Sequence, residues 1–251
     1  MKKLLLIILP VITLVSCSKG DDTNEPTTDY ETLDYFYSES TSLRIDVAYE
    51  DGFEPFTNSG FYNGDNFEFT QNNLTQLFAD RNRPISVIID KSLSEMEVLP
   101  AQNKQSFNKS ELINLAKQYK PTTSTASQNT LYVIFVNGYY DYTGGQVPNQ
   151  VIGLHMGSNT VAMFKPAINN ITNATERKHI EQKILTHEIG HAIGLVDAGI
   201  TMVSNHLSNT GKHCSNASCV MYATQGGTMS GSVNEFVFGQ DCHNDVTQYL
   251  N

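Results

Sequence analysis

Apolar and polar positions divide the chain into alternating strand-like and helix-like stretches. Residues 43–49 alternate apolar with polar side chains, which is typical of a strand with one buried face. The run 85–89, which is rich in β-branched residues, and the apolar run 131–136 predict buried strands. Further strands are expected at 151–155 and 161–165, and the glycine-containing turn between them predicts a β-hairpin.

The helical stretches lie between these strands. A helix capped by its first residue is expected over 70–81, and a second from Asn108 or Ser110 to residue 120, directly before a proline. Asn173 opens a long helix, with Glu176 three residues on as in a capping box. This alternation predicts an α/β (α+β) fold with a mixed sheet.

Composition narrows the functional class. The chain has 251 residues and a net charge of −10. Eleven carboxylates and one cation, Arg44, lie between residues 21 and 54, so the acidity belongs mainly to an N-terminal segment. Nucleic-acid binding needs clustered lysine and arginine, so the charge argues against a nucleic-acid partner. Beyond the N-terminus no apolar run is long enough to cross a membrane.

The N-terminus carries an export signal. A short basic start is followed by the apolar stretch 4–15, too short for a membrane span. The sequence Leu14-Val15-Ser16-Cys17 resembles the lipobox of bacterial lipoproteins. The resemblance implies cleavage before Cys17, lipidation of that residue and anchoring in the cell envelope, with the outer membrane as the expected location.

These features predict the domain organisation. Residues 1–16 are expected to be a lipoprotein signal peptide, and 17–40 a lipidated cysteine with an acidic flexible tether. Residues 41–251 then form the folded domain. Its N-terminal subdomain is expected to run to about residue 194, and its loop-rich C-terminal subdomain covers 195–251.

The segment 186–195 contains the candidate metal-binding and catalytic residues. His187 and His191 are spaced i, i+4, so a helix places both imidazoles on one face, where they can grip one Zn²⁺. Glu188 lies beside them and is the expected general base for a metal-activated water. The motif predicts one catalytic zinc.

The third ligand is less clearly marked. Gly194 allows a sharp exit from the helix, so that a later residue can return to the metal. The arrangement resembles the metzincin clan of zinc peptidases, whose motif ends in a third histidine; here Asp197 occupies that position. His206 and His213 are the other candidates.

Residues 213–221 favour His213. Its sequence, His-Cys-Ser-Asn-Ala-Ser-Cys-Val-Met, resembles the segment of archaemetzincins in which the third zinc-binding histidine precedes Cys and Cys-x-Met. The resemblance implies a metzincin-like twisted sheet, His213 as third ligand, and Met221 packed beneath the metal. It covers 186–222 specifically.

Three cysteines remain after Cys17. Archaemetzincins hold a second, structural zinc through four cysteines, but this chain offers Cys214, Cys219 and Cys242, with Asp245 at the fourth position. Either these three bind zinc with Asp245 or His243, or two of them form a disulfide. Export to an oxidising compartment favours the disulfide.

The resemblance implies a membrane-anchored zinc metallopeptidase acting on a peptide or protein substrate. Its substrate backbone is expected to pair with an edge strand within 151–165. The alternative is a surface-binding lipoprotein or adhesin whose zinc site is mainly structural, although such a site has no need of Glu188 as a base.

Overall fold

A six-stranded mixed sheet forms the centre of the computed structural model, which describes residues 29–57, 65–141, 151–223 and 237–250. Its main path runs β2-β1-β5-β8-β7, and β3 pairs with the later part of β1. All pairings in this sheet are parallel except β7–β8, the expected hairpin. The predicted α/β class with a mixed sheet is confirmed. The strands of this sheet are β1 (Ser42–Glu50), β2 (Ser86–Ile89), β3 (Glu97–Leu99), β5 (Gln128–Val136), β7 (Gly153–Gly157) and β8 (Thr160–Phe164).

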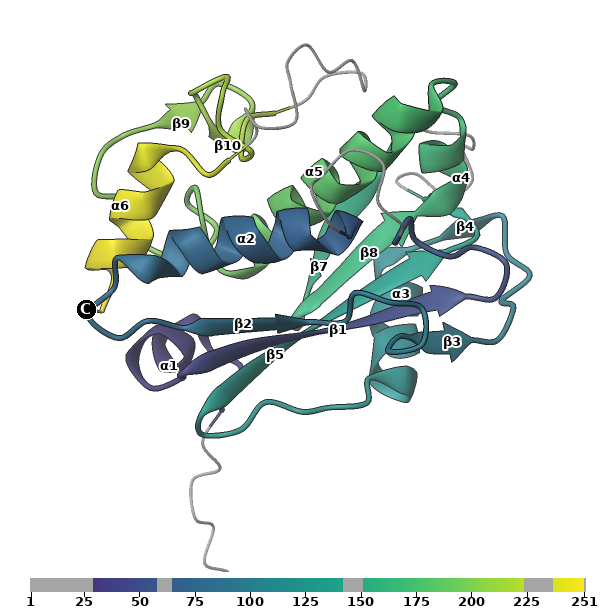
Figure 1. Cartoon of the computed structure of the whole chain (residues 1–251), viewed down its shortest axis with the longest axis horizontal. Coiled ribbons are helices and arrows are strands. Elements are labelled where there is room, and N and C mark those ends of the chain that lie inside the picture. Colours follow the sequence, from purple (N-terminus) through teal and green to yellow (C-terminus); the bar gives the residue numbers. More distant parts are fainter. Residues whose placement is uncertain (1–28, 58–64, 142–150, 224–236, 251) are drawn as a thin grey trace, which may run out of the picture.

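Helices cover both faces of the sheet (Figure 1). The long helices α2 and α5 pack against one another on one face, and α3 lies on the other. The helices are α1 (Leu33–Ser38), α2 (Asn66–Ala79), α3 (Lys109–Tyr119), α4 (Lys165–Asn169), α5 (Ala174–Ala192) and α6 (Gln240–Gln248). Two small sheets pair β4 (Ser106–Phe107) with β6 (Tyr139–Tyr140), and β9 (Leu207–Ser208) with β10 (Gly211–Cys214).

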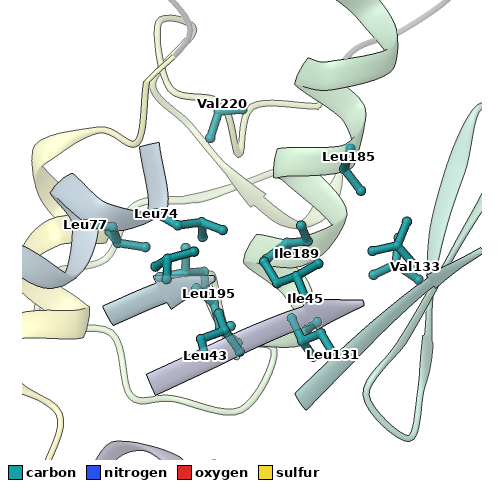
Figure 2. Packing of buried hydrophobic residues seen from close by; sticks show 14 of the residues in the cluster. Leu43, Ile45, Leu74, Leu77, Leu131, Val133, Leu185, Ile189, Leu195 and Val220 are labelled. Carbon is teal, nitrogen blue, oxygen red and sulfur yellow. The ribbon is translucent and has the colours of Figure 1, made fainter. Parts of the chain in front are cut away.

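The larger hydrophobic core lies between the sheet and the helices α2 and α5. Figure 2 shows Leu43 and Ile45 of β1 facing Leu74 of α2 and Ile189 of α5. All four side chains are buried, which provides the main driving force for seating α5 on the sheet. A second core on the opposite face is closed by α3. The segment of α5 that carries His187 and His191 is therefore held by packing along its length.

Several expected boundaries shift. The first long helix begins at Asn66 rather than at Thr70, whose buried hydroxyl instead bonds Gln182 and Thr186 of α5. Asn108 caps α3 in a full capping box with Glu111. The strand β2 is a partly exposed edge strand, with Ile88 42% exposed, and is not buried on both faces as its apolar run suggests.

The folded part begins before residue 41, so the predicted limit of the tether is wrong. Residues 33–38 form the helix α1, whose Phe36 and Tyr37 are buried in the larger core. The Tyr37 hydroxyl donates a 2.9 Å hydrogen bond to the carbonyl of Ile193, at the end of α5. Aromatic residues within the acidic stretch bury enough apolar surface to order it, despite its charge. The predicted signal peptide, Cys17 and residues 17–28 lie outside the described residues.

After Gly194 the described chain is mostly loop, as expected, apart from the short β9–β10 pair and α6. Within the described residues, none of the helices combines the length and the apolar character that crossing a bilayer requires.

Candidate metal centre

The helix α5 brings the two motif histidines and Glu188 together. Asn173 caps its N-terminus by accepting hydrogen bonds from the backbone of Thr175 and Glu176, and the turns from Ile180 to Gly190 are buried. His187 and Glu188 are only 5% and 7% exposed. The last helical turn therefore presents its polar side chains from within the core rather than from the surface.

His187 and His191 face one another through their ring nitrogens. Their Nε2 atoms are 3.1 Å apart. The Nδ1 atom of His187 lies 2.8 Å from the carbonyl oxygen of Val220, which can only accept, so Nδ1 carries the proton and Nε2 carries the lone pair. In a tetrahedral zinc site, two nitrogens each about 2.05 Å from the ion lie roughly 3.3 Å apart, close to the separation seen here.

His213 of β10 completes a group of three imidazoles. Its ring centroid lies 5.2 Å from that of His187 and 5.4 Å from that of His191. The three residues offer ligand nitrogens within 4.8 Å of one another, so they fit one metal ion. The other candidates lie elsewhere: Asp197 is exposed after the end of α5, and His206 is buried in a separate cluster.

Burial keeps His187 and His191 neutral, which is the state in which they bind a metal. Burial, with the nearby His213 and Lys183, lowers the pKa of His187 to about 4, although the hydrogen bond to Val220 acts in the opposite direction. Burial, together with the neighbouring imidazoles, lowers the pKa of His191 to about 2. At neutral pH these two residues are therefore uncharged imidazoles.

A hydrogen bond of Glu188 links α5 to the edge strand β7. Its Oε2 accepts a 2.8 Å hydrogen bond from the backbone N–H of His155, on the edge strand β7. Burial raises the pKa of Glu188 to about 7, although this hydrogen bond acts in the opposite direction. A carboxyl group whose pKa lies near neutrality is suited to accept a proton and return it.

His155 is a residue of the site that sequence reasoning misses. Its side chain is half-buried, and burial, with Lys109 and Lys212, lowers its pKa to about 4. Only strand pairing brings it beside α5, and no local motif marks it. The expected strand at 151–155 was the signal in the sequence that could have pointed to His155, since it predicts an edge strand whose backbone N–H groups can reach α5.

Met221 packs against Gly190, the residue that precedes His191 on α5. It is fully buried, and its sulfur packs so closely on Gly190 that even a methyl group at position 190 would collide with it. Val220, the preceding residue, supplies the carbonyl that fixes the His187 ring. Val220 and Met221 thus both contact the turn of α5 that carries the two histidines.

A second buried cluster lies between β10 and α6. It contains Cys214, Cys219 and Cys242, all fully buried, together with His206. The three cysteines are free thiols, and the sulfur atoms of Cys219 and Cys242 are 3.7 Å apart, far beyond the roughly 2.05 Å of a disulfide bond. The expected disulfide is therefore absent from this arrangement.

The fourth member of the cluster differs from both expected candidates. His206, 4% exposed, places Nδ1 3.4 Å from the sulfur of Cys214. Asp245 does not approach the sulfurs in this way but bonds the other ring nitrogen of His206 at 2.8 Å. His243 lies outside the group.

Comparison with known proteins adds no family assignment: no family model matches the chain, and the curated proteins contain no significant match.

Proposed function

We propose that the protein is a zinc-dependent metallopeptidase, with His187, His191 and His213 as the protein ligands and Glu188 as general base. The observation that carries the proposal is the position of Glu188: a buried carboxylate beside three convergent imidazoles, bonded to the edge strand. A purely structural metal site gains nothing from such a base.

The chain's own residues would divide the work as follows. His187, His191 and His213 would hold the metal. Zinc there would supply Lewis acidity towards the substrate and the attacking water. Glu188 would accept the proton of the attacking water and return it to the leaving amine, while the N–H of His155 holds the carboxylate in place.

The substrate in this proposal is an extended peptide. Among the strands that the structure describes, β7 ends the path of the sheet, and it packs on α5, where its His155 N–H meets Glu188. A peptide backbone can add to such an edge through main-chain hydrogen bonds, which gives affinity without strict sequence preference.

We also propose that Cys214, Cys219 and Cys242 bind a second, structural zinc. Backbone N–H groups point at their sulfurs: Asn216 to Cys214 at 3.4 Å and Gly239 to Cys219 at 3.1 Å. Such donors stabilise thiolates, the form that binds zinc.

We further propose that a lipid on Cys17 anchors the domain in the cell envelope, with residues 18–28 as the remaining tether. Several acyl chains would make this attachment stable, since each buried CH₂ contributes about 0.8 kcal/mol.

The decisive experiment compares Glu188→Gln with Glu176→Gln, the same change on the first turn of α5. Purified proteins are assayed for cleavage of casein and of a quenched fluorescent peptide library, with and without chelator. Their zinc content is also measured. Glu188→Gln should keep its zinc and lose at least about a hundredfold in turnover, as expected for removal of a general base. Glu176→Gln should keep both.

The result also separates the alternative function. Full zinc loading without chelator-sensitive cleavage of any peptide by the wild-type protein would favour a binding lipoprotein with a structural metal. Near-normal turnover of Glu188→Gln would refute the mechanism.

A further inference from the structure

His206, Cys214 and Cys242 offer ligand atoms within 4.8 Å of one another, and Cys219 joins this group through Cys242. In a zinc tetrahedron with Zn–S near 2.3 Å, two sulfurs lie roughly 3.8 Å apart, and a sulfur and a nitrogen roughly 3.6 Å apart. The Cys219–Cys242 separation is 3.7 Å, and the distance from His206 Nδ1 to the Cys214 sulfur is 3.4 Å. Both distances match within a few tenths of an ångström.

Asp245 orients His206 for this role. It is fully buried: one carboxylate oxygen lies 2.8 Å from His206 Nε2, and the other accepts a 2.7 Å hydrogen bond from the backbone of Val203. A carboxylate on Nε2 fixes the proton there and leaves the Nδ1 lone pair directed at the sulfurs. A cation bound by Nδ1 and the sulfurs would explain why this oriented imidazole faces buried cysteines.

The cluster is joined to the three-histidine group through the backbone. Cys214 directly follows His213, and its N–H donates to the carbonyl of Met221 at 2.8 Å. Val220, whose carbonyl holds the His187 ring, lies between Cys219 and Met221. Cys214 is thus next in sequence to His213, and Cys219 is next to Val220, whose carbonyl contacts His187.

We infer that His206, oriented by Asp245, is the fourth ligand of the thiolate site, and that this completed site fixes His213 and the Val220 carbonyl for the catalytic metal. The inference rests on the proposed metal sites. It explains how an exposed two-stranded segment, β9–β10, delivers a ligand accurately: His213 is about half-buried, but the cysteine that follows it is anchored in the core. Filling the thiolate site and binding at the histidine site are therefore coupled.

The coupling is reciprocal in free energy, because both sites favour the same conformation of residues 213–221. A coupling of tenfold in affinity corresponds to about 1.4 kcal/mol, a modest demand for a link made of adjacent residues and buried hydrogen bonds.

The test measures metal binding rather than peptidase activity. Cobalt(II) is titrated into apo-protein, because thiolate ligands give charge-transfer absorption that a three-histidine site lacks, and zinc stoichiometry is measured after dialysis. The wild-type protein should bind two ions. His206→Ala should weaken the thiolate site and also lower the affinity of the histidine site by about tenfold.

Two further variants keep the result interpretable. Asp245→Asn should weaken the thiolate site by roughly 10- to 100-fold, as expected for loss of an orienting partner. His206→Cys should restore both ions, because a cysteine sulfur reaches nearly as far from the backbone as Nδ1. His243→Ala is the matched control, since this half-buried neighbour of Cys242 lies outside the cluster, and it should bind both ions normally.

The outcomes separate this inference from the peptidase proposal. Unchanged metal binding in His206→Ala, a disulfide detected by thiol alkylation, or a folded His206→Cys variant that binds no ion at the sulfurs would each overturn it. If His206→Ala fails to fold, the His206→Cys and Asp245→Asn titrations decide. A protein without peptidase activity but with coupled sites would refute the proposed function and leave this inference standing.

Discussion

Substituting Gly194 by alanine should destabilise the protein through two separate effects. Gly194 directly follows the end of α5 at φ +91°, a region that L-residues occupy at a cost of roughly 1–2 kcal/mol. A Cβ placed there would also lie 2.7 Å from Leu33 Cδ1 and 3.1 Å from the backbone nitrogen of Ile200. The backbone atom cannot move aside cheaply, so overpacking should add about 1–3 kcal/mol.

Gly52→Ala provides the matched control. Gly52 has φ +82° but has no neighbouring atom within 4 Å of the added Cβ, so the substitution carries the backbone strain without the collision. Both substitutions restrict the unfolded chain equally, so that contribution cancels between them. Gly194→Ala should therefore be less stable than Gly52→Ala by about 1–3 kcal/mol, a large fraction of a typical 5–15 kcal/mol total.

Urea unfolding followed by circular dichroism measures this difference, at fixed zinc concentration because bound metal stabilises the native state. Adding Leu33→Ala to the Gly194→Ala variant should relieve only part of the clash, because the Ile200 contact remains. Equal midpoints for Gly194→Ala and Gly52→Ala would show that the close contacts around the helix exit do not exist, and would leave the positive φ as the reason for glycine at this position.

Three other substitutions test separate parts of the structure. Lys165→Met should cost about 3–5 kcal/mol in urea unfolding, because it strands Glu181, the fully buried partner of a 2.6 Å ion pair; replacing both residues by apolar ones should cost less. Asp197→Ala should leave zinc affinity unchanged by calorimetry, whereas His213→Ala should lower it sharply; the reverse order would refute the assignment of the third ligand. Cys17→Ala should abolish palmitate labelling in cells without changing metal content, and persistent labelling would place the anchor elsewhere.

Local sequence pattern was sufficient to predict most strands and helices and two residues of the candidate metal site, His187 and His191. The alternation at 43–49 and the apolar run at 131–136 became β1 and β5, and the i, i+4 spacing of His187 and His191 brought their nitrogens to 3.1 Å. These features depend on backbone periodicity and on neighbours within one helical turn, which a sequence states directly.

The choice among more distant residues depended on tertiary structure. Spacing alone left Asp197, His206 and His213 open, because a loop after Gly194 can return along many paths, and only the resemblance of residues 213–221 to archaemetzincins favoured His213. Cys214 is buried in the core, so the preceding His213 lies with His187 and His191. His206 lies beside the sulfurs of Cys214 and Cys242.

The same distinction explains the errors at the two ends of the chain. The acidic composition before residue 41 concealed Phe36 and Tyr37, which order α1 only because the end of α5 offers them a buried surface. The inferred export to an oxidising compartment suggested a disulfide, whereas the position of α6 decided which atoms Cys242 meets. Short-range periodicity is encoded residue by residue, but contacts that close long loops are selected by the packing of the whole core.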